Sequence, residues 1–485
     1  MTKISIRNAI ITSTLAVSLL LTPAAAMAAD SQQTTDEQTS QPSDLQLIQE
    51  VLDYINQYNV SGVTKEQLIR GAIEGMVYEL DDPYSEYFTA EDLKQFQDSI
   101  NQDYVGIGVT LYVENNKLMV DSVIPGSPAE TSGIKAGDII TRINGQPVKG
   151  SDSAADLAGD ANSKVTVTVQ RAGKSLTFNI TRAEVYIPSV EASISSSKIG
   201  YIKLSSFSET ADEEFSAAMS KLKGAGMKSL VLDLRNDGGG YIETATNIAK
   251  QLMDKGILMY TQDQSGQLVP QTVTGGEKIG VPIIVLTNEN SASASEILTG
   301  ALHDNRLATT VGTTTFGKAR IQNVIPLSNG DALKLTTQKY LTPNKLDFNK
   351  IGLKPDFEVR GSTAQLVTAF SLAGMKSMKI TGDNHSLTLN GQRFDGVLGS
   401  IKKGNSIYVP SRVLAAMLQS EVSWNAKEKK IIITDARGRQ SSFTVSSGQV
   451  VFQNGDSYIE IHQFVKKYPA LKWSYAQNKL TLSVQ

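Results

Sequence analysis

The stretch VPIIVLTNENSASASEILTGALHDN (281–305) indicates how the central part of this chain is built. Its first part, VPIIVLTNE (281–289), is an apolar, β-branched run that predicts a buried strand, and its last part has apolar residues at helical spacing. Ser291, Ser293 and Ser295 lie between them. A turn of small residues between a buried strand and a helix is a frequent place for the nucleophile of a hydrolytic enzyme, so these serines are candidates.

Histidine is the usual base for a serine nucleophile, but none is suitably placed here. His303 lies ten residues after Ser293 (303 − 293 = 10), near the far end of the same predicted helix. Ten helical residues rise about 15 Å, which is too far for a hydrogen bond. A Ser-His-Asp triad is therefore disfavoured, and Ser-Lys catalysis, which needs a lysine in an apolar setting that lowers its pKa, is a known alternative.

The composition excludes several other classes of protein. The 485 residues fit about three domains. Lys and Arg total 46 against 49 Asp and Glu, a net charge of −3, so nothing indicates nucleic-acid binding. There is no cysteine, which excludes disulfides, thiolate metal sites and a cysteine nucleophile. The three histidines are scattered, so we predict neither a metal site nor a cofactor.

The N-terminus has the pattern of a signal peptide. Lys3 and Arg7 precede an apolar run over 10–21, and TPAAAMAAD follows with an A-x-A cleavage site. We predict a signal peptide over 1–28, with an uncleaved anchor as the alternative, and a polar linker over 29–44. The protein is then expected outside the cytoplasmic membrane, secreted or associated with the cell envelope.

Residues 45–100 show helical periodicity, broken by a turn at DDPYSEYF (81–88). We interpret this region as structural, serving packing or dimerisation, and expect a homodimer.

Residues 104–183 read as short strands and resemble a PDZ domain. The resemblance rests on YVGIG (104–108) and on GSPAETSGIKAGDIITRINGQPV, although ADLAGDANSK lacks the usual Pro-Gly. It implies a carboxylate-binding loop beside a strand that can accept a peptide as an added strand. The peptide-binding residues would be Tyr104, Val105, Gly106, Ile107 and Gly108. A PDZ domain that only packs against the enzyme and gates it is the alternative.

Residues 184–360 alternate strand-like and helical segments, which predicts an α/β core. Together with the preceding regions, they resemble the C-terminal processing peptidases, the tail-specific family of serine peptidases. The resemblance covers about 45–360 and rests on SASASE and TFGK, and on DPYS (82–85), DLRNDGGG (233–240) and GLKPD (352–356). It implies a ClpP/crotonase-like peptidase core that needs no cofactor.

The resemblance also implies the catalytic residues. They are Ser293 as nucleophile, Lys318 as base (318 − 293 = 25) and Gln322 as its orienting partner (322 − 318 = 4). The backbone N–H groups of Gly239 and Ala294 would form the oxyanion hole. Lys318 and Gln322, an even number apart, would share one face of a strand. Ser291 and Ser295 are interpreted as turn and capping residues.

Two departures from the family pattern concern this site. Ala319 stands where the family usually has glycine, and Gly238 stands where proline is common. Arg235 has two interpretations: it binds a substrate carbonyl, or it pairs with Asp233 or Asp237, and pairing is favoured.

Residues 376–485 form a weak internal repeat, in which each half has a helix followed by a strand with Trp424 or Trp473. They resemble the stalk-like domain named for the N-terminal domain of copper amine oxidases, without a cluster of metal ligands. This domain is expected to serve surface display, substrate presentation or dimerisation.

The chain as a whole is predicted to be multidomain: an N-terminal helical segment, a PDZ domain, the α/β peptidase core and a small α+β C-terminal domain. Its predicted function is a secreted serine endopeptidase that recognises exposed C-terminal tails of protein substrates and is gated by its PDZ domain. The alternatives are a catalytically inactive PDZ and stalk binding protein, or a cell-wall-binding surface protein.

Overall fold

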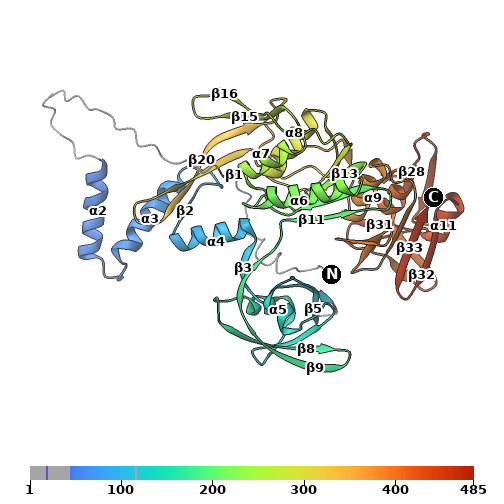
Figure 1. Cartoon of the computed structure of the whole chain (residues 1–485), viewed down its shortest axis with the longest axis horizontal. Helices are drawn as coiled ribbons and strands as arrows, with labels where there is room; N and C mark the ends of the chain where they lie inside the picture. Colours follow the sequence, from blue (N-terminus) through green and yellow to red (C-terminus); the bar gives the residue numbers. More distant parts are fainter. Residues whose placement is uncertain (1–17, 20–43, 115–116) are drawn as a thin grey trace.

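A computed structural model of the chain describes residues 18–19, 44–114 and 117–485 (Figure 1). The predicted signal peptide and linker lie outside these residues, apart from Ser18, Leu19 and Asp44. None of the helices in the described part is both long and apolar enough to cross a membrane.

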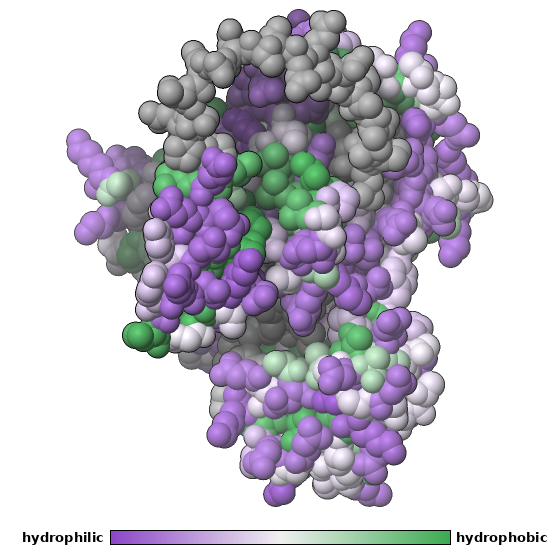
Figure 2. Space-filling view, turned by 90° about the vertical axis from the view of Figure 1, so that its left-hand side faces the viewer, coloured by the Kyte–Doolittle hydropathy of each residue, from purple (hydrophilic) through white to green (hydrophobic). Residues whose placement is uncertain are grey.

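The N-terminal region contains three helices and one strand. They are α2 (Asp44–Tyr58), α3 (Lys65–Tyr78), β2 (Glu86–Phe88) and α4 (Ala90–Asn101). Neither α2 nor α3 contains a buried residue, and both project from the body of the molecule (Figure 1). Figure 2 looks onto this side, where apolar groups lie among polar ones. The exposed apolar residues of α2 include Leu45, Leu47, Ile48, Val51 and Tyr54.

The predicted PDZ segment folds around a sheet with the order β4-β5-β6-β8-β9. Strand β4, which follows the YVGIG loop, is therefore an edge strand. Two paired strands, β3 (Asp103–Gly106) and β10 (Ala183–Tyr186), join this domain to the rest of the chain (Figure 1). Its other elements are β4 (Val109–Glu114), β5 (Lys117–Val123), α5 (Pro128–Ser132), β6 (Ile139–Ile143), β7 (Gln146–Pro147), η1 (Gly150–Leu157), β8 (Lys164–Arg171) and β9 (Lys174–Thr181).

The central domain is built on a six-stranded sheet with the order β11-β12-β13-β17-β18-β21, parallel from β12 onward. Alternate residues of its strands face opposite sides. Leu232 and Val285 pack among the helices, whereas Val231 and Ile284 face the C-terminal domain. The elements are β11 (Val190–Ile194), β12 (Ile199–Leu204), α6 (Ala211–Gly224), β13 (Ser229–Asp233), α7 (Ile242–Lys250), β17 (Ile283–Thr287), α8 (Ala294–Asp304), β18 (Ala308–Gly312) and β21 (Phe357–Glu358).

A second sheet has the order β14-β1-β19-β20-β15-β16, and β2 of the N-terminal region pairs with β20. The two-residue strand β1 (Ser18–Leu19) lies between β14 and β19 and runs parallel to both, with Leu19 opposite Gln322. The other strands are β14 (Gly240–Tyr241), β15 (Gly256–Gln262), β16 (Leu268–Val273), β19 (Arg320–Pro326) and β20 (Ala332–Leu341).

The C-terminal region begins with α9 (Ser362–Leu372) and continues with the predicted repeat. Each half has the order strand, helix, strand, strand: β26-α10-β27-β28 and then β31-α11-β32-β33. Its elements are β22 (Met378–Gly382), β23 (Leu387–Leu389), β24 (Gln392–Phe394), β25 (Ile401–Lys403), β26 (Ser406–Pro410), α10 (Ser411–Met417), β27 (Glu421–Asn425), β28 (Lys430–Thr434), β29 (Gln440–Thr444), β30 (Val450–Gln453), β31 (Asp456–Glu460), α11 (Ile461–Lys467), β32 (Lys472–Ala476) and β33 (Lys479–Val484).

The C-terminal region shares one hydrophobic core with the central sheet. Tyr201 and Leu286 of that sheet pack in the same cluster as Phe370 of α9, Phe394 of β24 and Leu414 of α10. The rings of Phe370 and Phe394 both lie against Tyr201, at centroid distances of 6.1 and 5.0 Å. The C-terminal region thus covers the sheet face opposite helices α6, α7 and α8.

Candidate active site

Ser293 occupies a strained turn at the start of α8. It is fully buried, and its backbone has φ 56° and ψ −114°. A positive φ is costly for a residue with a Cβ and occurs mainly where the surrounding structure enforces it, often at functional sites. The turn places the hydroxyl at a helix N-terminus, where the helix dipole favours developing negative charge.

The hydroxyls of the neighbouring serines connect this turn to the loop after β13 by hydrogen bonds. The Ser291 hydroxyl donates to the Leu234 carbonyl at 2.8 Å, and the Ser295 hydroxyl donates to the Asp237 carbonyl at 3.0 Å. Both have structural roles, as predicted, but the expected capping role is wrong, because Ser293 itself is the N-cap of α8.

Lys318 lies in the loop before β19, not within the strand. The predicted shared strand face of Lys318 and Gln322 is therefore wrong: β19 begins at Arg320, and its pairing with β20 shifts register between Ile321 and Gln322. The Lys318 side chain is fully buried, and its Nζ has no hydrogen-bond partner among the described residues. Burial, assisted by the charge of Lys334, lowers the pKa of Lys318 well below that of a free lysine.

Glu296 joins the turn of Ser293 to the loop of Lys318. Its buried carboxylate accepts the N–H groups of Ser293, Gly317 and Lys318 at 2.7–2.9 Å, together with the hydroxyl of Thr315. Burial raises the pKa of Glu296, and these hydrogen bonds oppose the rise. Glu296 was not among the residues predicted from the sequence, although Ser293-x-x-Glu296 has the spacing of a capping box and could have indicated it.

The side-chain amide of Gln322 is hydrogen-bonded at one end only, as far as the described residues show. Its Nε2 donates to Thr336 Oγ1 at 3.0 Å, and its Oε1 is buried without a hydrogen-bond partner among the described residues. The site thus contains an unpaired buried acceptor on Gln322 and an unpaired buried donor on Lys318. Unpaired buried polar groups are uncommon and call for a functional explanation.

The two predicted oxyanion donors flank Ser293. Ala294 is the first residue of α8. Gly239 packs so closely that a Cβ there would lie 2.8 Å from the Cβ of Ser293. In this conformation, however, the Gly239 N–H donates to Asp237 Oδ1 at 2.8 Å. Asp237 is fully buried, its Oδ2 has no partner in the described chain, and burial raises its pKa well above the usual value.

The departure at Ala319 does not strain the loop. Ala319 is not among the residues with positive φ, whereas Gly317 has φ 87°. A Cβ on Gly317 would also come within 2.7 Å of the Gly352 nitrogen. The position in this loop that requires glycine is therefore 317, and it is occupied by glycine.

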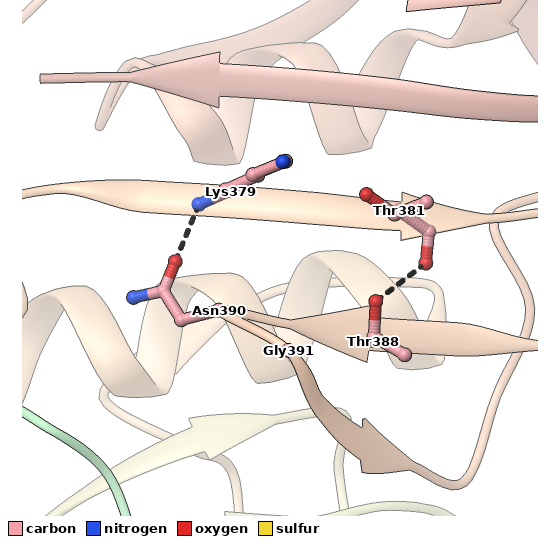
Figure 3. A pocket seen from close by; sticks show the side chains of 5 residues that line it. All are labelled: Lys379, Thr381, Thr388, Asn390 and Gly391. Carbon is pink, nitrogen blue, oxygen red and sulfur yellow. Dashed lines mark hydrogen bonds between the residues drawn. The ribbon is translucent and has the colours of Figure 1, made fainter.

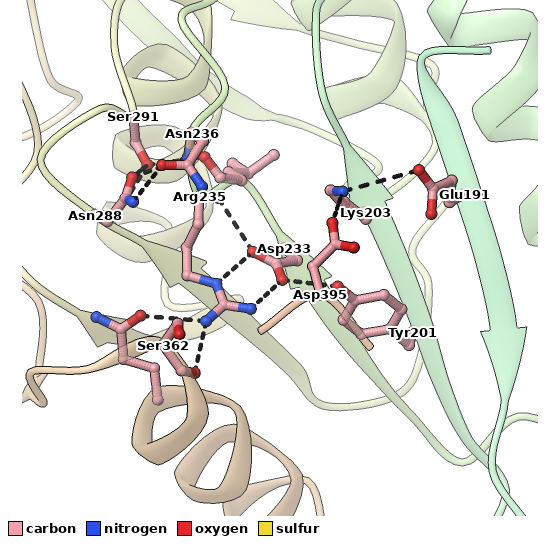
Figure 4. A network of polar contacts seen from close by, with 12 residues as sticks. Glu191, Tyr201, Lys203, Asp233, Arg235, Asn236, Asn288, Ser291, Ser362 and Asp395 are labelled. Atoms are coloured by element: carbon pink, nitrogen blue, oxygen red, sulfur yellow. Dashed lines mark hydrogen bonds and ion pairs between the residues drawn. The ribbon is translucent and has the colours of Figure 1, made fainter. Parts of the chain in front are cut away.

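Arg235 is a structural residue (Figure 4). Its guanidinium forms two hydrogen bonds to the Asp233 carboxylate, at 2.8 and 2.5 Å, and also donates to the Ser362 carbonyl of α9. Tyr201 donates to the same carboxylate at 2.8 Å. The favoured interpretation of Arg235, pairing with a carboxylate, is confirmed, with Asp233 as the partner.

The predicted PDZ loop is shaped by its glycines and by Tyr104. A Cβ on Gly108 would overlap Ser127, and a Cβ on Gly106 would lie 2.5 Å from the Tyr104 ring. Tyr104 Oη is buried without a hydrogen-bond partner among the described residues. Burial raises the pKa of Tyr104 to about 12, against the opposing effect of the nearby N–H groups of Gly108 and Val109.

The other loop residues support the start of β4. Val105 accepts the Gly159 N–H at 3.2 Å, and Ile107 accepts the Ala129 N–H at 2.7 Å while its side chain enters the domain core.

A pocket on the C-terminal sheet offers no comparable chemistry (Figure 3). It is lined by Lys379, Thr381, Thr388, Asn390 and Gly391 of the β22–β23 region. Two hydrogen bonds join its lining residues: the Lys379 N–H donates to Asn390 Oδ1 at 2.7 Å, and the Thr388 hydroxyl donates to the Thr381 carbonyl at 3.1 Å.

Comparison with known proteins gives the family of this chain. The profile of peptidase family S41 matches residues 198–359, that of the PDZ domain matches 105–181, and that of the activating protease CtpB N-terminal domain matches 12–92. A probable CtpA-like serine protease of Staphylococcus aureus is 35% identical over 71% of this chain and 70% of its own length. The chain belongs to peptidase family S41.

Two further proteins are similar to this chain. The carboxy-terminal processing protease CtpB of Bacillus subtilis is 36% identical over 64% of this chain and 67% of its own length. A solved photosystem II D1 C-terminal processing protease is 30% identical, with a TM-score of 0.41, over 65% of this chain and 93% of that one.

Membership of family S41 establishes the class of activity. The chain is a serine-type C-terminal processing endopeptidase that acts on protein substrates, and it combines a PDZ domain with an S41 core. The alternative of a catalytically inactive binding protein is not supported. The resemblance of the C-terminal region to a stalk domain stays a prediction.

Proposed function

We propose that this S41 peptidase cleaves peptide bonds with Ser293 as nucleophile and Lys318 as general base. The observation that carries the proposal is the buried Lys318 amine, which has no hydrogen-bond partner within residues 18–19, 44–114 and 117–485. Glu296 joins its loop to the turn of Ser293. An amine with a lowered pKa is neutral in a useful fraction of molecules near neutral pH and can accept the serine proton.

The reaction would proceed through an acyl-enzyme. The Ser293 hydroxyl loses its proton to Lys318 Nζ, and its oxygen attacks the scissile carbonyl carbon. The tetrahedral intermediate collapses, Lys318 returns the proton to the leaving amine, and water then hydrolyses the ester with Lys318 again as base. Gln322 Oε1, which has no hydrogen-bond partner in the part of the chain that the structure describes, would accept an N–H from Lys318 and orient the amine.

The oxyanion would be stabilised by the N–H groups of Ala294 and Gly239. Because the Gly239 N–H is donated to Asp237 in this conformation, it must turn toward the substrate before it can act. The position of β1, parallel to β19 with Leu19 opposite Gln322, supports an extended substrate segment between β14 and β19.

The PDZ loop would select the substrates of the enzyme by binding their C-terminal residues. Residues 104–108 and the free edge of β4 can take the C-terminal residues of a protein as an added strand. The signal-peptide pattern supports a location outside the cytoplasmic membrane, secreted or in the cell envelope. The exposed apolar residues of α2 support a homodimer.

The test uses pairs of protein substrates that differ only in a free or amidated C-terminus. The mature enzyme is expected to cleave the free form faster, and Ser293→Ala is expected to cleave neither. Equal rates on both forms would show that the PDZ domain does not read the terminal carboxylate and acts only as a passive cover. Cleavage by folded Ser293→Ala would disprove the assignment of the nucleophile.

A further inference from the structure

The turn after α3 covers the amine of Lys318. Tyr84, in the DPYS segment (82–85), is 7% exposed, and its ring centroid lies 4.9 Å from Lys318 Nζ. The segment leads directly into β2, which pairs with β20 of the second sheet. The N-terminal region, interpreted from sequence as structural, therefore forms part of the wall around the proposed base.

The same turn holds Gln322 through a chain of hydrogen bonds. The Ser85 hydroxyl donates to Asp82 Oδ2 at 2.6 Å and accepts the Thr336 N–H at 3.0 Å. Thr336 Oγ1 accepts Nε2 of Gln322 at 3.0 Å. With Nε2 fixed in this way, Oε1 is the end of the Gln322 amide that stays unpaired. The turn thus fixes which end of the amide is available to Lys318.

The charges around Lys318 come from three elements. Asp82 belongs to the turn, Glu296 to α8 and Lys334 to β20. Burial would raise the pKa of Asp82, but hydrogen bonds from Ser85, Thr336 and the backbone outweigh it, so Asp82 is ionised near neutral pH. Lys334 forms an ion pair with Glu86 at 2.8 Å. Asp82 and Glu296 favour the charged form of Lys318, and Lys334 together with burial disfavours it.

We propose that the DPYS turn is a positioning element of the catalytic site. Tyr84 excludes water from the Lys318 amine, and Asp82, with Ser85 and Thr336, orients the Gln322 amide. This inference rests on the proposed role of Lys318 as base. It assigns to the N-terminal region a direct effect on the protonation of that base.

The test is the pH dependence of Ser293 acylation by a small ester in single-turnover experiments, where the PDZ domain is not needed for substrate capture. Tyr84→Ala is expected to admit water and so to raise the pKa of Lys318. The rising limb of the pH–rate profile then moves toward alkaline pH by about one unit, and the acylation rate at a pH on that limb falls about tenfold. Tyr84→Phe retains the ring and is expected to keep the limb at its wild-type pH.

Asp82→Asn provides a second variant with the opposite sign. It removes a negative charge that raises the pKa of Lys318, so the limb is expected to move toward acidic pH. Loss of activity at every pH without a shift of the limb in either folded variant would reduce the turn to a merely structural role and overturn the inference. Retained activity in Lys318→Arg would instead disprove the proposed function itself.

Discussion

Glu296 and Asp237 show how two buried carboxylates organise the residues around Ser293. Glu296 is saturated: its oxygens accept three backbone N–H groups and one hydroxyl, which fixes Ser293 and Lys318 relative to each other. Asp237 is not saturated, since it accepts one N–H and has a second oxygen without a partner in the described chain. The first carboxylate stabilises the site, and the second accepts the Gly239 N–H, which is proposed as an oxyanion donor.

Asp237→Asn is predicted to gain stability and activity relative to the wild type as the pH rises. Burial raises the folded-state pKa of Asp237, so its contribution to stability is present at low pH and is lost as the pH rises through the folded pKa. The ionised Asp237 carboxylate also accepts the Gly239 N–H, and its negative charge would repel an oxyanion. Loss of one oxyanion donor lowers kcat by about 100-fold or more.

Thermal unfolding and pH–rate profiles of both proteins check this prediction. The Tm and the rate of Asp237→Asn, each relative to the wild type, should increase from acidic to alkaline pH. Ratios that stay constant across this range would mean that Asp237 does not change its charge there.

At the scale of elements, β3 and the loop that follows it connect the PDZ site to the peptidase. Tyr104 belongs to β3, and its ring lies over Gly106 in the loop that would bind a terminal carboxylate. Its buried phenol oxygen lies near the N–H groups of Gly108 and Val109. Those groups are the donors that a substrate carboxylate would need.

Tyr104→Phe is predicted to bind free-tailed peptides more tightly, because it removes a competing acceptor from the loop. The phenol oxygen lies near the N–H groups of Gly108 and Val109 without a hydrogen bond to them, so the gain is at most about 1 kcal/mol, or about a fivefold lower Kd. Calorimetric titration with a tail peptide measures this, and the amidated peptide serves as the control, since its affinity should not change. Weaker binding of the free peptide would show that the phenol assists recognition.

The sequence singled out Ser293, Lys318 and Gln322 as candidate catalytic residues because they fall in short, spaced motifs. The strand-to-helix junction that holds Ser293 was predicted from the same stretch and is confirmed. The position of Lys318 relative to β19 was not predicted, because Gly317 and the hydrogen bonds of Glu296 keep residues 315–319 out of the strand. Tyr84 was missed because the contact joins residues 234 positions apart (318 − 84 = 234), which no local pattern shows.

At the scale of the whole molecule, the C-terminal region is part of the peptidase core. Its residues fill the face of the central sheet that α6, α7 and α8 leave open, and Arg235 is bonded to the carbonyl of Ser362 in α9. The region also meets the PDZ domain through an ion pair of Arg393 with Asp121 at 2.7 Å. An independently folded stalk would show neither feature.

Phe370→Ala is predicted to destabilise the peptidase core and the C-terminal region together. Phe370 is 1% exposed and packs on Tyr201, and truncation of a buried phenylalanine costs about 3–5 kcal/mol. Calorimetry should show one transition for both parts, lowered in this variant. Phe452→Ala, at an exposed position of β30, is the matched control and should change little. A separate C-terminal transition, with peptidase activity unchanged, would contradict a shared core.

Lys318, and no histidine, is proposed to activate Ser293. The most direct measurement is the rate at which a fluorophosphonate labels Ser293, followed by intact mass as a function of pH. In the wild type the rate should rise along one limb well below the pKa of about 10.4 of a free lysine. His303→Ala should give the same profile. Lys318→Arg retains the positive charge but cannot deprotonate, so it should fold and remain unlabelled. Labelling of Lys318→Arg at a near wild-type rate, or loss of labelling in folded His303→Ala, would contradict the account.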